Sequence, residues 1–110
     1  MDANMLKFVF FGLILLAVVL EVAGDVLFKK WALENRSTLF IAGLAIYFIG
    51  TIFWAISLKY EFLSRAITVF TVLNLVLVTL AGVLIFNEEL TLANKAGIVL
   101  GVLSIILVEL

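Results

Sequence analysis

Four long apolar runs, separated by short charged links, take up almost all of this 110-residue sequence. The runs cover residues 6–28, 38–58, 62–86 and 92–110. Each has about 20 residues, which is enough to cross a bilayer as one helix. Backbone polar groups in lipid must find their hydrogen bonds within the segment, so runs this apolar are predicted to be helical. The sequence therefore predicts an all-α membrane protein with four transmembrane helices.

Composition supports the membrane class and excludes several functions. Hydrophobic residues make up 66% of the chain, more than a soluble domain of this length could bury. There is no Cys and no His, so neither thiolate chemistry nor a transition-metal site is expected. A net charge of −1 offers no basic surface for nucleic acid. We expect no enzyme activity, no cofactor and no metal.

The short links constrain the topology of residues 1–110, which we expect to form a single domain. Such links favour an up-down-up-down bundle with both termini on one side. The positive charges on the two sides are nearly balanced: Lys7, Lys59 and Arg65 against Lys29, Lys30, Arg36 and Lys95. Because orientation follows the difference in positive charge, the chain could insert both ways and form an antiparallel homodimer. The alternative is one weakly specified orientation.

Glu21 lies inside the first apolar run, about 22 Å along a helix that begins at residue 6. A carboxylate there costs about 2.5–3.5 kcal/mol or more, and such residues usually handle ions, protons or substrates. Asp25 shares its helix face, with Ala17 and Gly24 nearby. Asp25 also has a structural explanation, a pair with Lys29 one turn further on. For Glu21 the structural alternative is a buried hydrogen bond to a neighbouring helix.

The third and fourth runs carry weaker signals. Thr71 and Asn74 are polar positions within the third run, where Asn74 could bond another helix or contact substrate. Phe70 could line a cavity or simply pack. Gly97 and Gly101 form a GxxxG pair in the fourth run, a pattern typical of close helix packing or a dimer contact.

Several motifs resemble the small multidrug resistance family of the drug/metabolite transporter superfamily. They are LEVAG at 20–24 with Phe28 and Lys29, SLKY at 57–60, and GVLIFNEEL at 82–90 followed by Gly97 and Gly101. The resemblance covers nearly the whole chain. It implies a bacterial inner-membrane antiparallel homodimer, proton-coupled export, Glu21 as the shared proton and substrate site, and Gly97 and Gly101 at the dimer contact.

The chain also departs from that family. Ile67 and Phe70 stand where the family has Tyr and Trp, aromatic residues that would hold cations by cation–π contact. Asn74 followed by LVLVTLAG resembles instead the small paired subunits that flip aminoarabinose-modified lipid, although those lack the Glu in the first helix.

We therefore predict a proton-coupled exporter of a cationic or amphipathic compound, with protons, membrane lipid and a second copy as partners. Glu21, Asp25, Phe70, Thr71 and Asn74 are the predicted proton and substrate-binding residues. A lipid or glycolipid flippase of the same fold is the first alternative. A membrane assembly subunit that transports nothing is the second.

Overall fold

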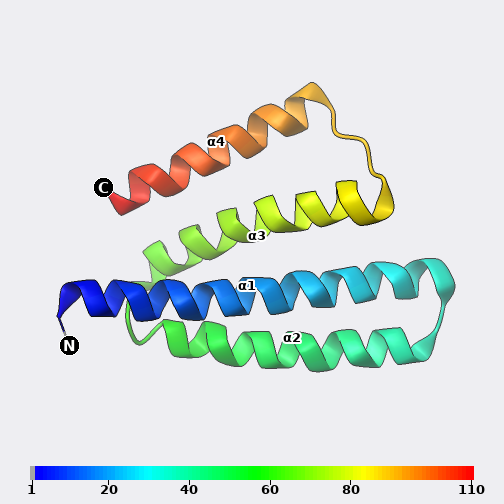
Figure 1. Ribbon diagram of the computed structural model, residues 1–110, viewed down its shortest axis with the longest axis horizontal. Helices are drawn as coiled ribbons and strands as arrows, with labels where there is room; N and C mark the ends of the chain where they lie inside the picture. Colours follow the sequence, from blue (N-terminus) through cyan, green and yellow to red (C-terminus); the bar gives the residue numbers. More distant parts are fainter. Residues whose placement is uncertain (1) are drawn as a thin grey trace.

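Four α-helices form the protein in the computed structural model, which describes residues 2–110. They are α1 (Ala3–Glu34), α2 (Ser37–Ser57), α3 (Leu63–Phe86) and α4 (Leu92–Glu109). All four are long and apolar enough to cross a membrane, and the described residues contain no strand. Successive helices alternate in direction, so α1 begins at the same end of the molecule where α4 finishes (Figure 1). The predicted all-α class with four membrane helices is confirmed.

The helix α1 is longer than the apolar run that predicted it. Its 32 residues correspond to about 48 Å, whereas the hydrocarbon core is about 30 Å thick. The predicted link from residue 29 is helical as far as Glu34 because KKWALE consists mostly of good helix formers. The helix stops at Asn35, whose φ is 56° and whose N–H donates to the Trp31 carbonyl at 2.7 Å. Hydropathy marks the membrane part of a helix, not its end.

A second left-handed asparagine, Asn87 at φ 54°, ends α3. Asn tolerates this conformation better than residues whose side chains cannot bond locally, and Gly tolerates it best. We expect Asn87→Ala to lower the free energy of unfolding by about 1 kcal/mol and Asn87→Gly to change it little. Thermal unfolding of both variants in detergent checks this. An equal loss in both would mean that the Asn87 side chain matters and the backbone conformation does not.

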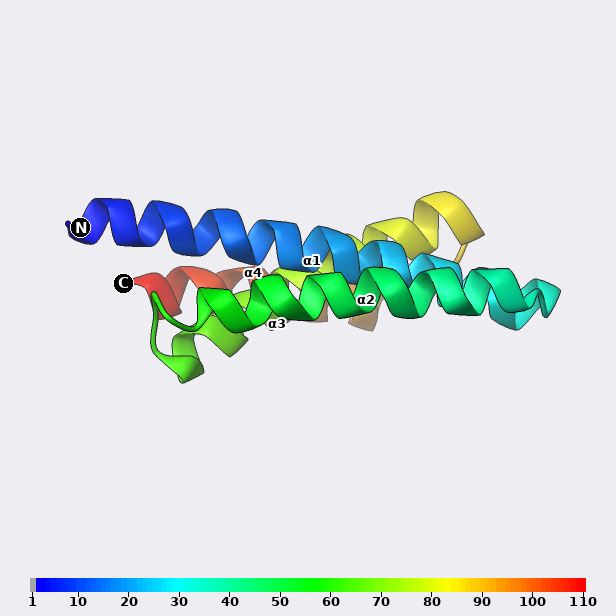
Figure 2. The same cartoon turned by 90° about the horizontal axis from the view of Figure 1, so that it is seen from below.

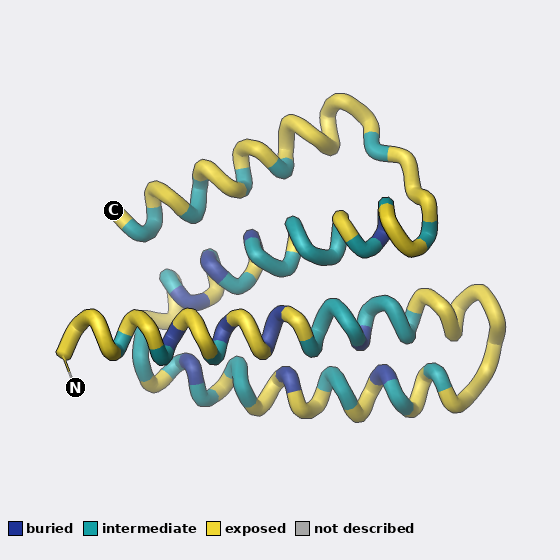
Figure 3. Tube along the Cα trace, in the orientation of Figure 1, coloured by how far each residue is buried: buried dark blue, intermediate teal, exposed yellow. Residues whose placement is uncertain are grey.

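The helices form an open row in the order α2, α1, α3, α4. Helix α1 packs on both α2 and α3, and α4 packs chiefly on α3. The Cα trace measures 48 × 34 × 18 Å. In Figure 2 the shortest of these dimensions runs vertically. No residue of α4 is buried, whereas each of the other helices contributes buried positions (Figure 3). The chain thus keeps the predicted up-down-up-down order and leaves α4 at one edge.

The hydrophobic core lies where α1 crosses α3. It consists of fully buried side chains from the first half of α1 and the first half of α3: Phe10, Ile14, Val18, Ala66 and Val69. Trp54 of α2 and Leu58, which directly follows that helix, cover it from one side and remain partly exposed. This packing fixes the end of the molecule that holds the chain termini, and leaves the opposite ends of α1 and α3 less tightly filled.

Helix α4 is attached to α3 at two places. The Arg65 guanidinium near the start of α3 lies 3.4 Å from the Glu109 carboxylate at the end of α4 and 3.7 Å from Glu61. Further along, Gly101 approaches α3 closely enough that an added β-carbon would lie 3.7 Å from Val72. Arg65 therefore links α3 to α4 through its ion pair with Glu109.

Candidate substrate site

Glu21 points into the interface between α1 and α2. It is partly buried, and a β-carbon added at Gly50 of α2 would lie only 3.2 Å from its Cγ. Leu20 and the Ala17 carbonyl are equally close to that position, at 3.2 and 3.3 Å. Because Gly50 has no side chain, it leaves free the space between α1 and α2 that the Glu21 side chain occupies.

Asp25 extends the polar cluster one turn along α1. Tyr47 of α2 is its neighbour across the helix interface, and all three ionisable groups, Glu21, Asp25 and Tyr47, are close enough to influence one another. In a medium of low dielectric constant, two neighbouring carboxyl groups favour a bound proton or a bound cation. Within residues 2–110, no three acidic side chains gather as a metal site would require. The chemistry available is that of paired carboxyl groups beside a phenol.

Glycines shape the surfaces that bring these groups together. A β-carbon at Gly43 would lie 2.8 Å from the Phe28 ring, and one at Gly24 would lie 2.6 Å from the Tyr47 ring. Each glycine thus faces a large side chain of the opposite helix. Small residues allow this close approach between membrane helices.

Sequence reasoning did not identify Gly43, Tyr47 and Gly50 as part of the site. The signal that could have found them is their spacing of four and then three residues, which puts all three on one helix face. Glu21 and Gly24, with Phe28, have the matching arrangement on α1. Reading the two helices as an antiparallel pair would have placed the Glu21 side chain against a glycine.

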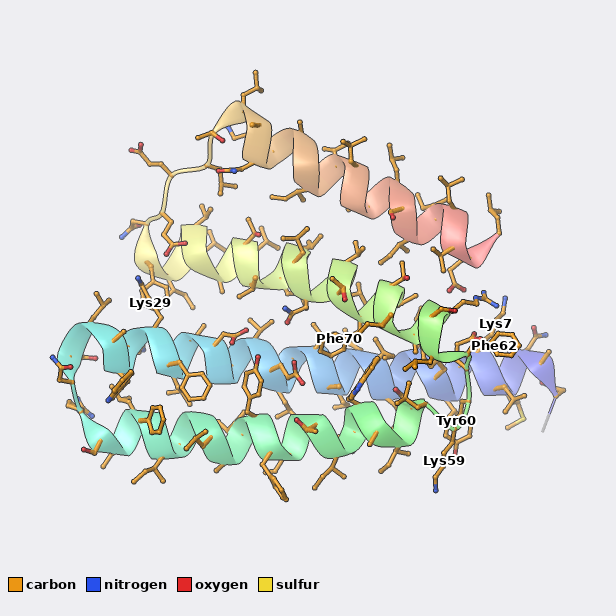
Figure 4. The ribbon with its side chains drawn as sticks, turned by 180° about the vertical axis from the view of Figure 1, so that it is seen from behind. Lys7, Lys29, Lys59, Tyr60, Phe62 and Phe70 are labelled. Carbon is orange, nitrogen blue, oxygen red and sulfur yellow. The ribbon has the colours of Figure 1, made fainter. Side chains whose placement is uncertain are left out.

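The predicted positions on α3 lie in three different environments. Phe70 packs against Trp54 with ring centroids 4.9 Å apart, and Figure 4 places it between α3 and α1. The Asn74 side-chain oxygen is buried and has no hydrogen-bond partner within residues 2–110. Thr71 is exposed. The structure thus brings Glu21 and Asp25 together, gives Phe70 a packing contact and leaves Thr71 outside the interface.

The two glycines of the GxxxG pair differ in their surroundings. Gly101 faces Val72 and Leu75 of α3, where an added β-carbon would make ordinary contacts at 3.6–3.7 Å. A β-carbon added at Gly97 would meet nothing within 4 Å. Within one chain, only Gly101 serves a helix contact, and Gly97 stands on the open side of α4.

Comparison with known proteins identifies the family. The sequence model of the EamA-like transporter family matches residues 1–110. The probable 4-amino-4-deoxy-L-arabinose-phosphoundecaprenol flippase subunit ArnE of Hamiltonella defensa subsp. Acyrthosiphon pisum (strain 5AT) is 37% identical over 103 residues, covering 86% of this chain and 91% of the relative. No solved structure matches the chain.

These matches agree with the resemblance seen in the sequence, both to drug/metabolite transporters and to aminoarabinose-lipid flippase subunits. With four membrane-spanning helices, the chain is a multi-pass protein of the bacterial inner membrane. The protein belongs to the EamA-like transporter family of the drug/metabolite transporter superfamily.

Proposed function

We propose that the protein moves an amine-bearing, lipid-linked substrate across the inner membrane. The observation that carries this proposal is the similarity, along most of both chains, to a relative named as a flippase subunit for an aminosugar linked to a polyprenyl phosphate. The polar cluster of Glu21, Asp25 and Tyr47 supports it, because a substrate amine needs carboxylates as partners inside lipid.

In this proposal Glu21 is the carboxylate that holds the amine during passage. An ammonium–carboxylate hydrogen bond is about twice as strong as a neutral one, and a dry interface strengthens it further. In this proposal a proton takes the place of the amine on Glu21 when no substrate is bound. Substrate entry then releases a proton, and substrate departure takes one up. The headgroup travels along the helices while its lipid tail stays in the bilayer.

Proton-coupled export of a small cation is the second candidate. The same cluster favours it, since two carboxyl groups one turn apart offer a site for which a proton and a soluble cation compete. The two candidates differ in the substrate and share Glu21. An assembly role without transport would require neither a lipid nor a cation at this site.

Reconstituted liposomes test the proposal directly. Purified protein would be placed in vesicles containing a polyprenyl phosphate that carries an aminopentose. A membrane-impermeant amine-reactive reagent then measures how much amine is in the outer leaflet over time. We expect faster exchange than in protein-free vesicles. Exchange at the protein-free rate, together with uptake of a soluble cation driven by a proton gradient, would favour the second candidate.

The copurifying material must be identified in the same experiment, because the named relative is a subunit. Mass spectrometry of the reconstituted sample shows whether another chain is present. Failure of all transport, with a larger partner copurifying in fixed ratio, would support the assembly role.

The predicted homodimer has its own test at Gly97. Because nothing within residues 2–110 occupies the space beside Gly97, Gly97→Leu should leave the unfolding temperature unchanged. If this glycine forms the dimer contact, the same change should lower the dimer fraction about tenfold or more, measured by light scattering in detergent. An unchanged dimer fraction would place any dimer contact elsewhere on the chain.

A further inference from the structure

A cavity of about 140 Å³ lies between α1 and α3, at the end of the molecule away from the chain termini. Its wall is mostly apolar, and three charged side chains stand among the apolar ones. The lining residues are Val26, Val78, Ala81, Gly82 and Phe86, with Asp25, Lys29 and Glu88. Glu21 is not among them, whereas Asp25, one turn further along α1, belongs both to this cavity and to the cluster that contains Glu21.

The end of α3 is built so that Glu88 returns to this cavity. Asn87 in the left-handed conformation reverses the chain, and the Glu88 N–H donates to the Gly82 carbonyl at 3.1 Å. The Glu88 carboxylate then lies over Gly82, in the space that any larger residue at position 82 would fill. Glu88, an exposed residue of the link between α3 and α4, is thereby held against the helix pair.

Lys29 supplies the opposite charge. Figure 4 places it on α1, facing the C-terminal end of α3. The sequence suggested that Lys29 pairs with Asp25, but the ion pairs within residues 2–110 are made by Arg36 and Arg65. No ion pair within the described residues therefore engages Asp25, Glu88 or Lys29, and Tyr47 lies beside Asp25.

We propose that this cavity binds the headgroup of a lipid that carries both an amine and a phosphate. Asp25 and Glu88 would accept hydrogen bonds from the amine, and Lys29 would donate to the phosphate. A cavity of about 150 Å³ holds a six-membered ring, so the space suits a small headgroup. The apolar wall fits the chain of a lipid better than a free solute. This inference rests on the proposed function and assigns the receiving site for its substrate.

Charge pattern is what makes this cavity selective. Two carboxylates alone would accept any cation, and a lysine alone would accept any anion. The three together favour a ligand with both charges, and disfavour anionic lipids by repulsion from the carboxylates. Phosphatidylethanolamine and phosphatidylglycerol, which share a phosphate and differ in the amine, are therefore suitable probes.

The binding test uses the purified full-length protein in detergent and calorimetric titration with short-chain phosphatidylethanolamine. We expect Lys29→Gln and Glu88→Gln each to weaken binding about tenfold, the loss of one charge-assisted contact. Lys30→Gln and Glu89→Gln are matched controls, since both are exposed neighbours that do not line the cavity. Short-chain phosphatidylglycerol should bind at least tenfold more weakly than phosphatidylethanolamine to the unaltered protein.

Three results would overturn the inference. These are equal binding of the two lipids, equal losses in the cavity variants and their controls, and binding of soluble phosphoethanolamine as tight as that of the lipid. The last would assign the cavity to a free solute. Glu34→Gln, a change on the same helix outside the cavity, should bind phosphatidylethanolamine normally. Lipid binding without translocation would therefore contradict the proposed function alone, and translocation insensitive to Lys29 and Glu88 would contradict this inference alone.

Discussion

Glu21→Gln is expected to lower the rate of substrate translocation about ten- to a hundredfold while the protein still folds. Gln has nearly the same shape, so the packing of residue 21 against Gly50 is retained. What disappears is the negative charge, and with it a hydrogen bond to an ammonium group worth about 1.5–3 kcal/mol. The stability of the fold should be unchanged or slightly higher, because no carboxyl group is then buried in lipid.

Glu34→Gln is the matched control for that variant. Glu34 is on the same helix, beyond the predicted membrane part, and its ion pair with Arg36 is long at 3.9 Å and largely exposed. Exposed pairs of this kind contribute about 0–1 kcal/mol. Equal transport by wild type and both variants in the liposome assay would remove Glu21 from the transport site. If Glu21→Gln lost both transport and folded protein, the role of Glu21 would instead be to stabilise the fold.

The second large effect is expected at the glycines between α1 and α2. Gly43→Leu and Gly50→Leu should each lower the free energy of unfolding by about 2–3 kcal/mol, the cost of overfilling a packed interface. At Gly43 the new side chain meets the Phe28 ring, and at Gly50 it meets Glu21 and the Ala17 carbonyl. Gly50→Leu should also abolish transport, since it displaces the Glu21 side chain.

Gly12→Leu provides the control, because a β-carbon at Gly12 would meet nothing within 4 Å. Its effect should stay within about 0.5 kcal/mol, as for most changes at open positions. Thermal unfolding in detergent can be followed by tryptophan fluorescence, to which both Trp31 and Trp54, the latter packed against the core, contribute. If Gly12→Leu were as damaging as Gly43→Leu, the loss would come from the residue type and not from the helix interface.

The sequence was sufficient to predict the fold class, because apolar runs of bilayer length have few alternatives to helices. It also located Glu21 and Asp25, since acids stand out against an apolar background. The end of α1 was missed for a related reason: residues 29–34 include three charged side chains and are still helical. Hydropathy identifies the segment of a helix that contacts lipid. It does not show whether the helix continues beyond that segment.

What surrounds the acids could not be predicted from one helix at a time. Tyr47 and Gly50 belong to the site through the antiparallel pairing of α1 with α2, which depends on how the two faces fit. Glu88 reaches its cavity only because Asn87 takes a left-handed conformation. Both effects are consequences of tertiary geometry. Nothing in the local sequence distinguishes Tyr47, Gly50 or Glu88 from the residues around it.

The open row of helices limits how a single chain can work. Because α4 packs chiefly on α3 and the row does not close into a ring, one chain does not surround a water-filled conduit. A molecule carried by one chain would move along an exposed face of the helix row, with the protein on one side of it and lipid hydrocarbon on the other. Such a face is open to a substrate that enters laterally from the bilayer, and it suits a substrate that stays partly within the lipid throughout.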